Sequence, residues 1–286
     1  MAGYKETPRQ KMIGMMYLVL TALLALNVSK DILQAFVTVN DGLKQTNANF
    51  EAKNEMMYND FRQQLTQQKE KVEPFYLKAL QVKEKSDAMV ERIKILMTDV
   101  VAFTEFGVSP KKDGSHRNDA DWKKAYDIDL SEVKKTDNFD KPISILIPDQ
   151  AKPETGEAYK LKIELENYEQ ELIKLIGEDP KTYDMGFNYE PGFNKFIKRE
   201  MSWEFNTFYS TVLAADVVIF NKMIAEVRNA EAEAVAKLMN NIRKLDFTFD
   251  DIAAKVVPQS MMIPAGSNYE ATLFVAAYDS RSPIRA

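Results

Sequence analysis

The sequence contains no cysteine and only one histidine, His116, among its 286 residues. Disulfide bridges, thiol catalysis and zinc sites made of cysteine and histidine are therefore excluded, because each needs residues that the chain lacks. A single histidine gives no Ser/His/Asp arrangement, and the chain also lacks a glycine-rich phosphate loop and an HExxH motif. We therefore expect a protein that is not an enzyme and that carries no cofactor.

A strongly basic surface is also missing. The chain has 38 Lys and Arg residues against 43 Asp and Glu residues, and its net charge is −5. The first 11 residues hold three basic side chains and one acidic one, so the remainder carries −7. Three lysine pairs, which begin at residues 111, 123 and 134, are flanked by acids and are interpreted as solvated faces. We expect no nucleic-acid partner.

Closely spaced carboxylates do not favour acid–base catalysis. The pairs Glu164/Glu166 and Glu231/Glu233 are each two residues apart. On a helix this spacing points the two side chains to different faces, so neither pair can act on one substrate atom. These pairs therefore give no support to general acid–base catalysis.

One long uncharged run stands out in this charged chain. It covers 18 residues, from Met12 to Ser29, between Lys11 and Lys30. At about 1.5 Å per residue the run spans roughly 27 Å, close to the ~30 Å hydrocarbon core of a bilayer. The sequence therefore predicts a transmembrane helix over residues 12–30. A cleavable signal peptide is the alternative, but no small-x-small cleavage site follows the run.

The flanks of this run predict where the helix begins and how it is oriented. Thr7, Pro8 and Gln10 form a capping-box pattern, so the helix is expected to begin near Pro8. Basic residues outnumber acidic ones before the run, whereas the charges after it cancel. By the positive-inside rule, we expect residues 1–11 to form a cytoplasmic tail and the chain after residue 30 to lie outside the cytoplasm.

Beyond the membrane segment the chain is predicted to be mainly α-helical. Apolar residues recur at three- and four-residue spacing, as on one buried helix face. The expected breaks are Glu73-Pro74 and Gly177 with Pro180. We expect a periplasmic domain over residues 31–244, built as an up-down bundle of long antiparallel helices. The four predicted helices cover residues 31–70, 74–105, 157–177 and 203–244.

A long segment, 106–155, separates the second and third predicted helices, and we expect it to be a loop with short apolar pieces. It contains four aspartates that suggest calcium binding. No stretch matches the twelve-residue calcium loop with its central glycine and terminal glutamate, which disfavours that interpretation. The aspartates are Asp119, Asp121, Asp127 and Asp129.

The segment 183–209 is rich in aromatic residues. Such a stretch can form a docking patch, a membrane-facing belt or part of the core at a bundle end. We favour packing into the core.

The last residues, 245–286, change pattern and predict β-strands. Two or three strands cannot form a sheet that buries its own face, so we expect the beginning of a β-sandwich-like domain that the chain does not complete. Apolar residues alternate with polar ones at Phe247 and Phe249, and again at Tyr269, Ala271, Leu273, Val275 and Ala277.

Polar residues in the predicted membrane helix are its candidate functional residues, because polar groups are costly there. At 100° per residue Arg9 and Asn27 fall on one stripe, and Tyr17 lies about 80° to one side. Arg9 can also be a charge at the lipid headgroups that sets topology, and Tyr17 an interfacial anchor. Asn27 can be a polar residue near the outer surface without a role. The spacing alone leaves these alternatives open.

The motif TPRQKM, the tyrosine five residues later and the stretch LLALNVSKDILQAF together carry a family resemblance. With the order of membrane helix, helical domain and β segment, the chain resembles gliding-motility protein M (GldM, also PorM), a component of the type IX secretion system of Bacteroidetes. The resemblance implies a motor driven by the proton motive force, in which two copies place their membrane helices inside a ring of five copies of gliding-motility protein L (GldL/PorL). It also implies that distal β domains contact periplasmic and outer-membrane components.

The resemblance also implies roles for the candidate residues. Arg9 is expected to pair with an intramembrane glutamate of the ring, with Tyr17 in the same packed helices and Asn27 as a further contact. Two helices in a ring of five cannot make identical contacts, so the two copies of Arg9 are expected to differ. Whether the driving ion is H⁺ or Na⁺, and whether the movement is rotary or linear, stays open.

A single-pass sensor or scaffold, whose anchor only holds a periplasmic domain in place, is the alternative function. The two functions differ at the anchor, because a passive anchor tolerates Arg9→Gln and Tyr17→Phe whereas a motor subunit does not.

Overall fold

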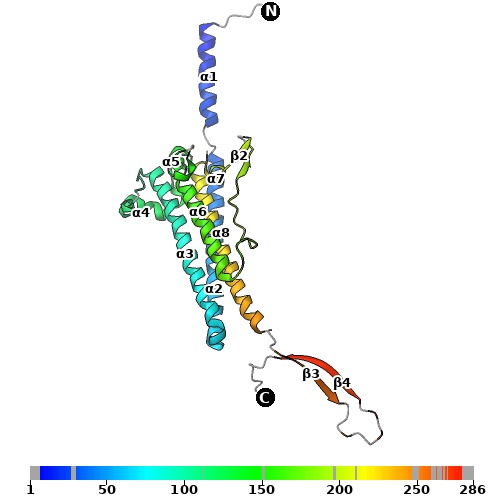
Figure 1. Ribbon diagram of the computed structural model, residues 1–286. Coiled ribbons are helices and arrows are strands. Elements are labelled where there is room, and N and C mark those ends of the chain that lie inside the picture. Colours follow the sequence, from blue (N-terminus) through cyan, green and yellow to red (C-terminus); the bar gives the residue numbers. More distant parts are fainter. Residues whose placement is uncertain are drawn as a thin grey trace, which may run out of the picture.

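The structure is a computed structural model that describes residues 7–26, 30–111, 113–149, 152–195, 198–209, 211–246, 251–258 and 271–278, with a few single residues between the last two ranges. It is mainly helical, as the sequence predicts, with two small antiparallel sheets (Figure 1). The long helices are α1 (Pro8–Leu26), α2 (Lys30–Gln67), α3 (Lys69–Glu105), α6 (Glu157–Ile176) and α8 (Leu213–Asp246).

The helices α2, α3, α6 and α8 form one bundle, in which α8 packs against the other three. Large side chains fill the bundle core, among them Phe61 of α2, Ile93 of α3 and Phe220 of α8, all fully buried. These residues belong to the apolar faces that their three- and four-residue spacing predicts. The bundle therefore has the continuous core that a domain of this length can form.

The direction of the helices differs from the predicted antiparallel bundle. Along α2 and α8 the paired residues advance together, from Asn40 with Asn221 to Tyr58 with Glu231, so these two helices run parallel. Along α6 and α8 the contacts also advance together. Only α3 runs the other way within this bundle. The prediction was wrong because the extended segment 177–212 carries the chain back along the bundle before α8 begins (Figure 1).

Two predicted helix boundaries also shift. The break between α2 and α3 lies at Gln68, and Pro74 sits in the second turn of α3, where it removes one helical hydrogen-bond donor. The predicted helix over 203–244 is divided into α7 (Trp203–Phe208) and α8. The start of α8 is fixed by contacts with the segment 106–155 (called the insertion below), because the N–H groups of Leu213 and Ala214 donate to the carbonyls of Asn138 and Thr136. By contrast α6 ends as predicted, at a left-handed Gly177.

The predicted loop over 106–155 is ordered into short helices. They are η1 (Ser115–Asn118), α4 (Ala120–Asp127), η2 (Leu130–Glu132), α5 (Asp140–Leu146) and η3 (Pro153–Thr155). Trp122, Leu130 and Leu146 are buried in the core, which anchors the insertion. Asp119 and Asp129 cap α4 and η2 by accepting hydrogen bonds from backbone N–H groups two residues later. These two aspartates therefore have capping roles.

The strands form two hairpins. In the first, β1 (Gly192–Asn194) pairs with β2 (Arg199–Met201), and in the second, β3 (Asp251–Pro258) pairs with β4 (Ala271–Tyr278). The strand predicted around residues 271–277 is confirmed, whereas Phe247, Phe249 and Tyr269 lie outside the described residues. Neighbouring residues that point to opposite faces of the second hairpin, such as Val256 and Val257, are both half exposed. This hairpin does not bury a face of its own.

Candidate functional site

The helix α1 begins where the capping box predicts. The Thr7 N–H donates to Gln10 Oε1 over 3.0 Å, and the Gln10 N–H donates to Thr7 Oγ1 over 3.4 Å. The two side chains thus satisfy each other's free N–H groups, and the first helical residue is Pro8. This local chemistry places Arg9 in the first turn of the helix.

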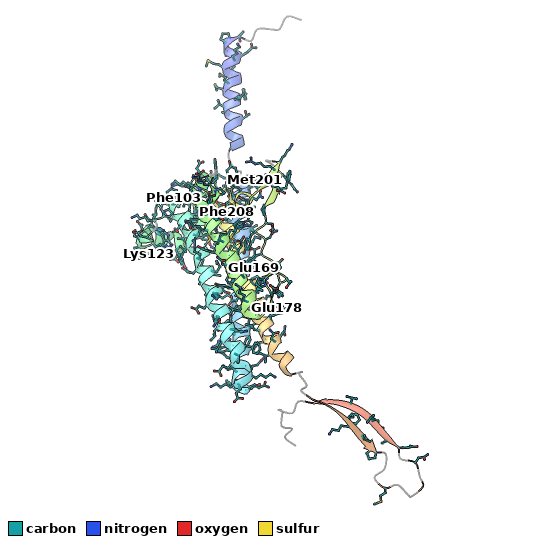
Figure 2. The ribbon with its side chains drawn as sticks, viewed as in Figure 1. Phe103, Lys123, Glu169, Glu178, Met201 and Phe208 are labelled. Atoms are coloured by element: carbon teal, nitrogen blue, oxygen red, sulfur yellow. The ribbon has the colours of Figure 1, made fainter. Side chains whose placement is uncertain are left out.

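No other element that the structure describes covers the helix α1. In Figure 2 its side chains point outward, with no other element beside them, and in Figure 1 the helix lies beyond one end of the bundle. Tyr17 is 68% exposed, and its neighbours are similarly open. The large apolar residues that are at least 45% exposed on this helix are Met12, Ile13, Met15, Met16, Leu18, Val19 and Leu20. Exposed apolar surfaces of this kind are typical of sites that contact lipid or another protein.

The structure places two of the three candidate residues. Arg9 and Tyr17 both lie on α1, eight residues and about 12 Å apart along the axis. Asn27 lies outside the described residues. Over the part of the chain that the structure describes, no helix combines the length and the apolar composition needed to cross a membrane.

A buried polar network joins the four helices of the bundle, and the sequence did not reveal it. Glu231 of α8 is 1% exposed. Its carboxylate accepts hydrogen bonds from Tyr58 Oη at 2.9 Å, Asn54 Nδ2 at 3.0 Å and Arg228 Nη1 at 2.9 Å. Arg228 also pairs with Asp87 of α3 over 2.7 Å. Burial, and then the Glu231 carboxylate, raise the pKa of Tyr58 above its usual range, so the phenol stays a donor.

The network extends to α6 through Tyr168, whose hydroxyl lies 2.8 Å from Ser86 Oγ and donates to the Val227 carbonyl at 3.3 Å. In the sequence Arg228 and Glu231 resemble an ordinary surface pair of a charged helix, so no local signal indicated their burial. Such satisfied networks hold neighbouring helices in one register.

Three asparagines of α2 face α8 at seven-residue spacing: Asn40, Asn47 and Asn54. Asn40 Oδ1 accepts from Asn221 Nδ2 at 2.8 Å, and Asn47 Nδ2 donates to the Asn221 carbonyl at 3.1 Å. Asn54 Nδ2 bonds the Arg228 carbonyl at 3.0 Å. The spacing was visible in the sequence, because residues seven apart return to one helix face, and it could have indicated a polar seam.

The only histidine has a structural role. His116 Nδ1 accepts from the Lys111 N–H at 3.0 Å, so Nε2 carries the proton and donates to Asp99 Oδ1 at 2.8 Å. Trp122 Nε1 donates to the same oxygen at 2.7 Å. Both ring nitrogens are therefore engaged, and the contacts fasten the insertion to α3. Within the described ranges, no group of three or more His, Asp and Glu side chains is placed to hold a metal ion.

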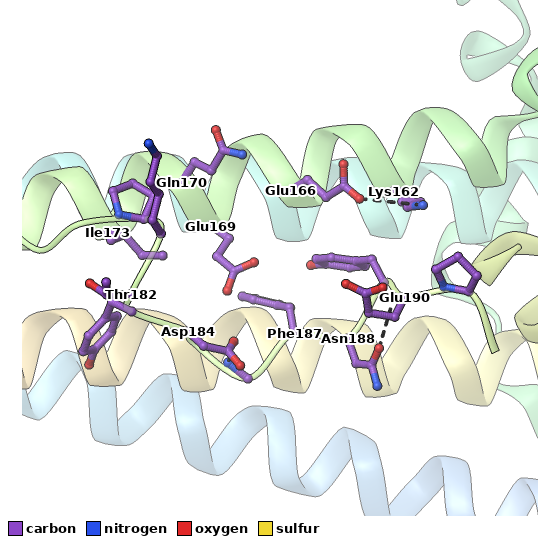
Figure 3. Close-up of a pocket in the computed structure, with 16 residues that line it drawn as sticks. Lys162, Glu166, Glu169, Gln170, Ile173, Thr182, Asp184, Phe187, Asn188 and Glu190 are labelled. Atoms are coloured by element: carbon purple, nitrogen blue, oxygen red, sulfur yellow. Dashed lines mark hydrogen bonds and ion pairs between the residues drawn. The ribbon is translucent and has the colours of Figure 1, made fainter.

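A groove of about 740 Å³ lies between α6 and the segment 180–191 (Figure 3). Its lining includes four carboxylates and two lysines. Glu169 accepts from the Met185 N–H at 3.1 Å, and burial raises the pKa of its carboxyl group. Within the segment 180–191, Asp184 accepts from the Gly186 N–H at 2.7 Å. These hydrogen bonds shape and fasten the segment.

Most described aromatic residues of the segment 183–209 pack against the core, as favoured from the sequence, whereas Phe193 is exposed. A chain of ring contacts runs from Tyr168 through Phe187, Tyr189 and Trp203 to Phe208, with centroids 5.7–6.2 Å apart. It follows the side of the bundle, however, and not only its end. These rings bind the returning segment to α6 and α8.

Comparison with protein families accounts for most of the chain. Residues 31–241 match the GldM N-terminal domain, and residues 243–285 match the GldM second domain. The comparison with curated proteins gave no match. GldM proteins are inner-membrane-anchored components that associate with others such as GldL, and they are not a known enzyme family. The chain therefore belongs to the GldM family, a family of gliding-motility and type IX secretion components.

Proposed function

We propose that this chain is the inner-membrane subunit of a motor, driven by the proton motive force, that powers type IX secretion and gliding motility. The observation that carries the proposal is α1, whose apolar side chains are exposed around the helix and whose first turn holds Arg9. Such a helix is stable in a bilayer or against other apolar helices. In this proposal residues 1–11 are cytoplasmic and 12–30 span the membrane. Residues 31–244 form the periplasmic bundle and 245–286 begin a β domain.

The partner in the membrane is a ring of five GldL copies around a dimer of this chain. Arg9 of one copy pairs with an intramembrane glutamate of the ring, while Tyr17 and Asn27 contact neighbouring helices. A guanidinium favours the charged form of a nearby carboxylate, so protonation weakens the pair and releases the helix to the next subunit. One charge crossing 100 mV carries roughly 2.3 kcal/mol, which can reset a pair of moderate strength.

The bundle transmits this movement across the periplasm, towards outer-membrane components that distal β domains contact. This part of the proposal is supported by the network around Glu231, which connects α2, α3 and α8 by hydrogen bonds of 2.7–3.0 Å. A bundle whose helices are fixed in register moves as one body. It can therefore pass on a displacement of α1 without losing it in sliding between helices.

Native mass spectrometry of the complex, extracted in mild detergent from the source membrane, tests the proposal. Two copies of this chain with five copies of one small polytopic protein that carries an intramembrane glutamate are expected. A homodimer without any membrane partner would contradict the motor and favour a sensor or scaffold. In that case Arg9 would be reduced to a residue that sets the topology.

A further inference from the structure

The hairpin of β1 and β2 is fastened to the end of the bundle that faces α1. Asn206 of α7 holds it there, because its Nδ2 donates to the carbonyls of Gly192 at 2.8 Å and Met201 at 3.2 Å. Its Oδ1 accepts from Asn194 Nδ2 at 3.1 Å. The helix α7 leads into the start of α8, which runs parallel to α2, so the hairpin lies at the end of the bundle where α2 starts (Figure 1). Figure 2 shows Met201, the last residue of β2, at this end.

The same end of the bundle carries exposed aromatic rings. Among the described residues of the range 31–246, the exposed phenylalanines are Phe106, Phe139 and Phe193, and Phe193 of β1 is 63% exposed. Phe106 follows the last residue of α3, which runs opposite to α2. Phe139 lies next to Asn138, whose carbonyl holds the start of α8. All three rings therefore lie towards α1, and exposed apolar side chains that gather on one face indicate a contact with lipid or protein.

The hairpin is basic in a chain that is acidic. Between residues 192 and 201, three exposed basic residues, Lys195, Lys198 and Arg199, stand against one acidic residue, Glu200. The hairpin therefore has a net charge of +2, whereas the net charge of the whole chain is −5. Exposed aromatic rings beside lysines are typical of surfaces that lie in the headgroup region of a bilayer, where the rings sit at the interface and the lysines meet phosphate groups.

The position next to α1 favours lipid over protein as the contact of the hairpin. In the proposed function residues 12–30 span the membrane, so α2 begins at the bilayer surface, and the present inference rests on that part of the proposed function. The headgroup region adds about 5–8 Å to each side of the hydrocarbon core, which is the height of about one helical turn. In Figure 1 the hairpin reaches the level at which α2 begins, so it can enter this region.

We propose that the hairpin of β1 and β2 docks on the surface of the membrane that α1 enters, with anionic phospholipids as its partner. The ring of Phe193 lies at the top of the lipid chains, and Lys195 and Lys198 lie against lipid phosphates. The bundle is then attached to the membrane at two points, α1 and the hairpin, which restricts its tilt.

The absence of cysteine makes the test direct, because a single introduced cysteine carries a label at one chosen position. Phe193→Cys, Leu18→Cys and Leu77→Cys each receive the same apolar fluorophore. The full chain is placed in vesicles of phosphatidylcholine and phosphatidylglycerol that contain nitroxide lipids, which quench fluorophores at the headgroup or along the lipid chain. Leu18 reports the insertion of α1, and Leu77, 54% exposed on α3 near the turn at Gln68, is the matched control at the opposite end. Quenching is expected at positions 193 and 18 but not at 77.

A pair of charge variants tests the role of the lysines. A lysine near an anionic surface strengthens binding about fivefold, so Lys195→Gln/Lys198→Gln is expected to lower the ratio of docked to undocked hairpin about 25-fold. Most of the quenching at position 193 is then lost. Lys69→Gln/Lys78→Gln removes the same charge from exposed positions at the opposite end of the bundle and is expected to leave the quenching unchanged.

The outcomes separate this inference from the proposed function. Quenching at position 18 without quenching at position 193 would overturn the docking while α1 stays in the membrane, and a protein would then be the contact of the hairpin. Quenching at neither position would overturn the proposed function and the docking together. Full quenching at position 193 after loss of both lysines would overturn anionic lipid as the partner.

Discussion

Replacement of Arg228 by methionine is expected to destabilise the bundle strongly, because it leaves a charge buried without its partner. Glu231 is 1% exposed and keeps only its neutral donors, Tyr58 and Asn54, when the guanidinium is lost. Removing one partner of a buried pair costs about 3–5 kcal/mol. The contact with Asp87 adds little, because the Asp87 side chain is 47% exposed and such pairs contribute at most about 1 kcal/mol.

The double variant Arg228→Met/Glu231→Leu is expected to be more stable than Arg228→Met alone. It removes both charges of the pair, leaves the Tyr58 hydroxyl without its acceptor at a cost of about 1–3 kcal/mol, and takes away one of the two acceptors of Asn54 Nδ2. Asn54 keeps its bond to the backbone carbonyl of residue 228. Urea unfolding followed by far-ultraviolet circular dichroism gives the free energy of unfolding for the parent, both single variants and the double variant. Additive losses would refute the reasoning, because the two charges would then not be coupled.

Three further predictions concern other parts of the chain. Burial raises the pKa of Asp216 to about 7, so the folded state retains a proton that the unfolded chain releases near pH 4. Stability should therefore fall by at most about 4 kcal/mol as the pH rises from about 4 to about 7, and thermal melts should show that Asp216→Asn removes this fall. Gly156→Ala places a Cβ against a backbone carbonyl oxygen at the end of α5 and should cost more than about 2 kcal/mol. Gly177→Ala, with open space but a φ of 84°, should cost about 1 kcal/mol, and the reverse order in urea melts would contradict the geometry. Arg9→Gln and Tyr17→Phe should leave expression and membrane insertion intact but nearly abolish secretion and gliding, whereas normal gliding speed in both would speak for a passive anchor.

The sequence predicted the features that local chemistry determines. The start of α1 follows from hydrogen bonds within Thr7–Gln10, and the end of α6 follows from Gly177, whose left-handed conformation suits glycine. The strand β4 follows from alternation alone. Each of these signals lies within a few residues and depends little on the rest of the fold.

Features that depend on contacts between distant segments escaped prediction. The direction of α8 is set by the return of segment 177–212, and the start of α8 by the carbonyls of Thr136 and Asn138. The burial of Glu231 depends on α2 and α3 packing against α8, which no pattern within α8 can express. At the candidate site, Arg9 was located by its motif.

The parallel course of α2 and α8 determines how the molecule responds to force. The chain enters the bundle through α2, next to α1, and leaves it through α8 towards β3, at the opposite end (Figure 1). A pulling force between these ends therefore acts parallel to the interface of α2 and α8 and loads it in shear. Its cross-contacts, from Asn40 with Asn221 to Tyr58 with Glu231, then share the load and must yield together. If the chain entered and left the bundle at the same end, a pulling force would instead separate the two helices one contact at a time, at a much lower force.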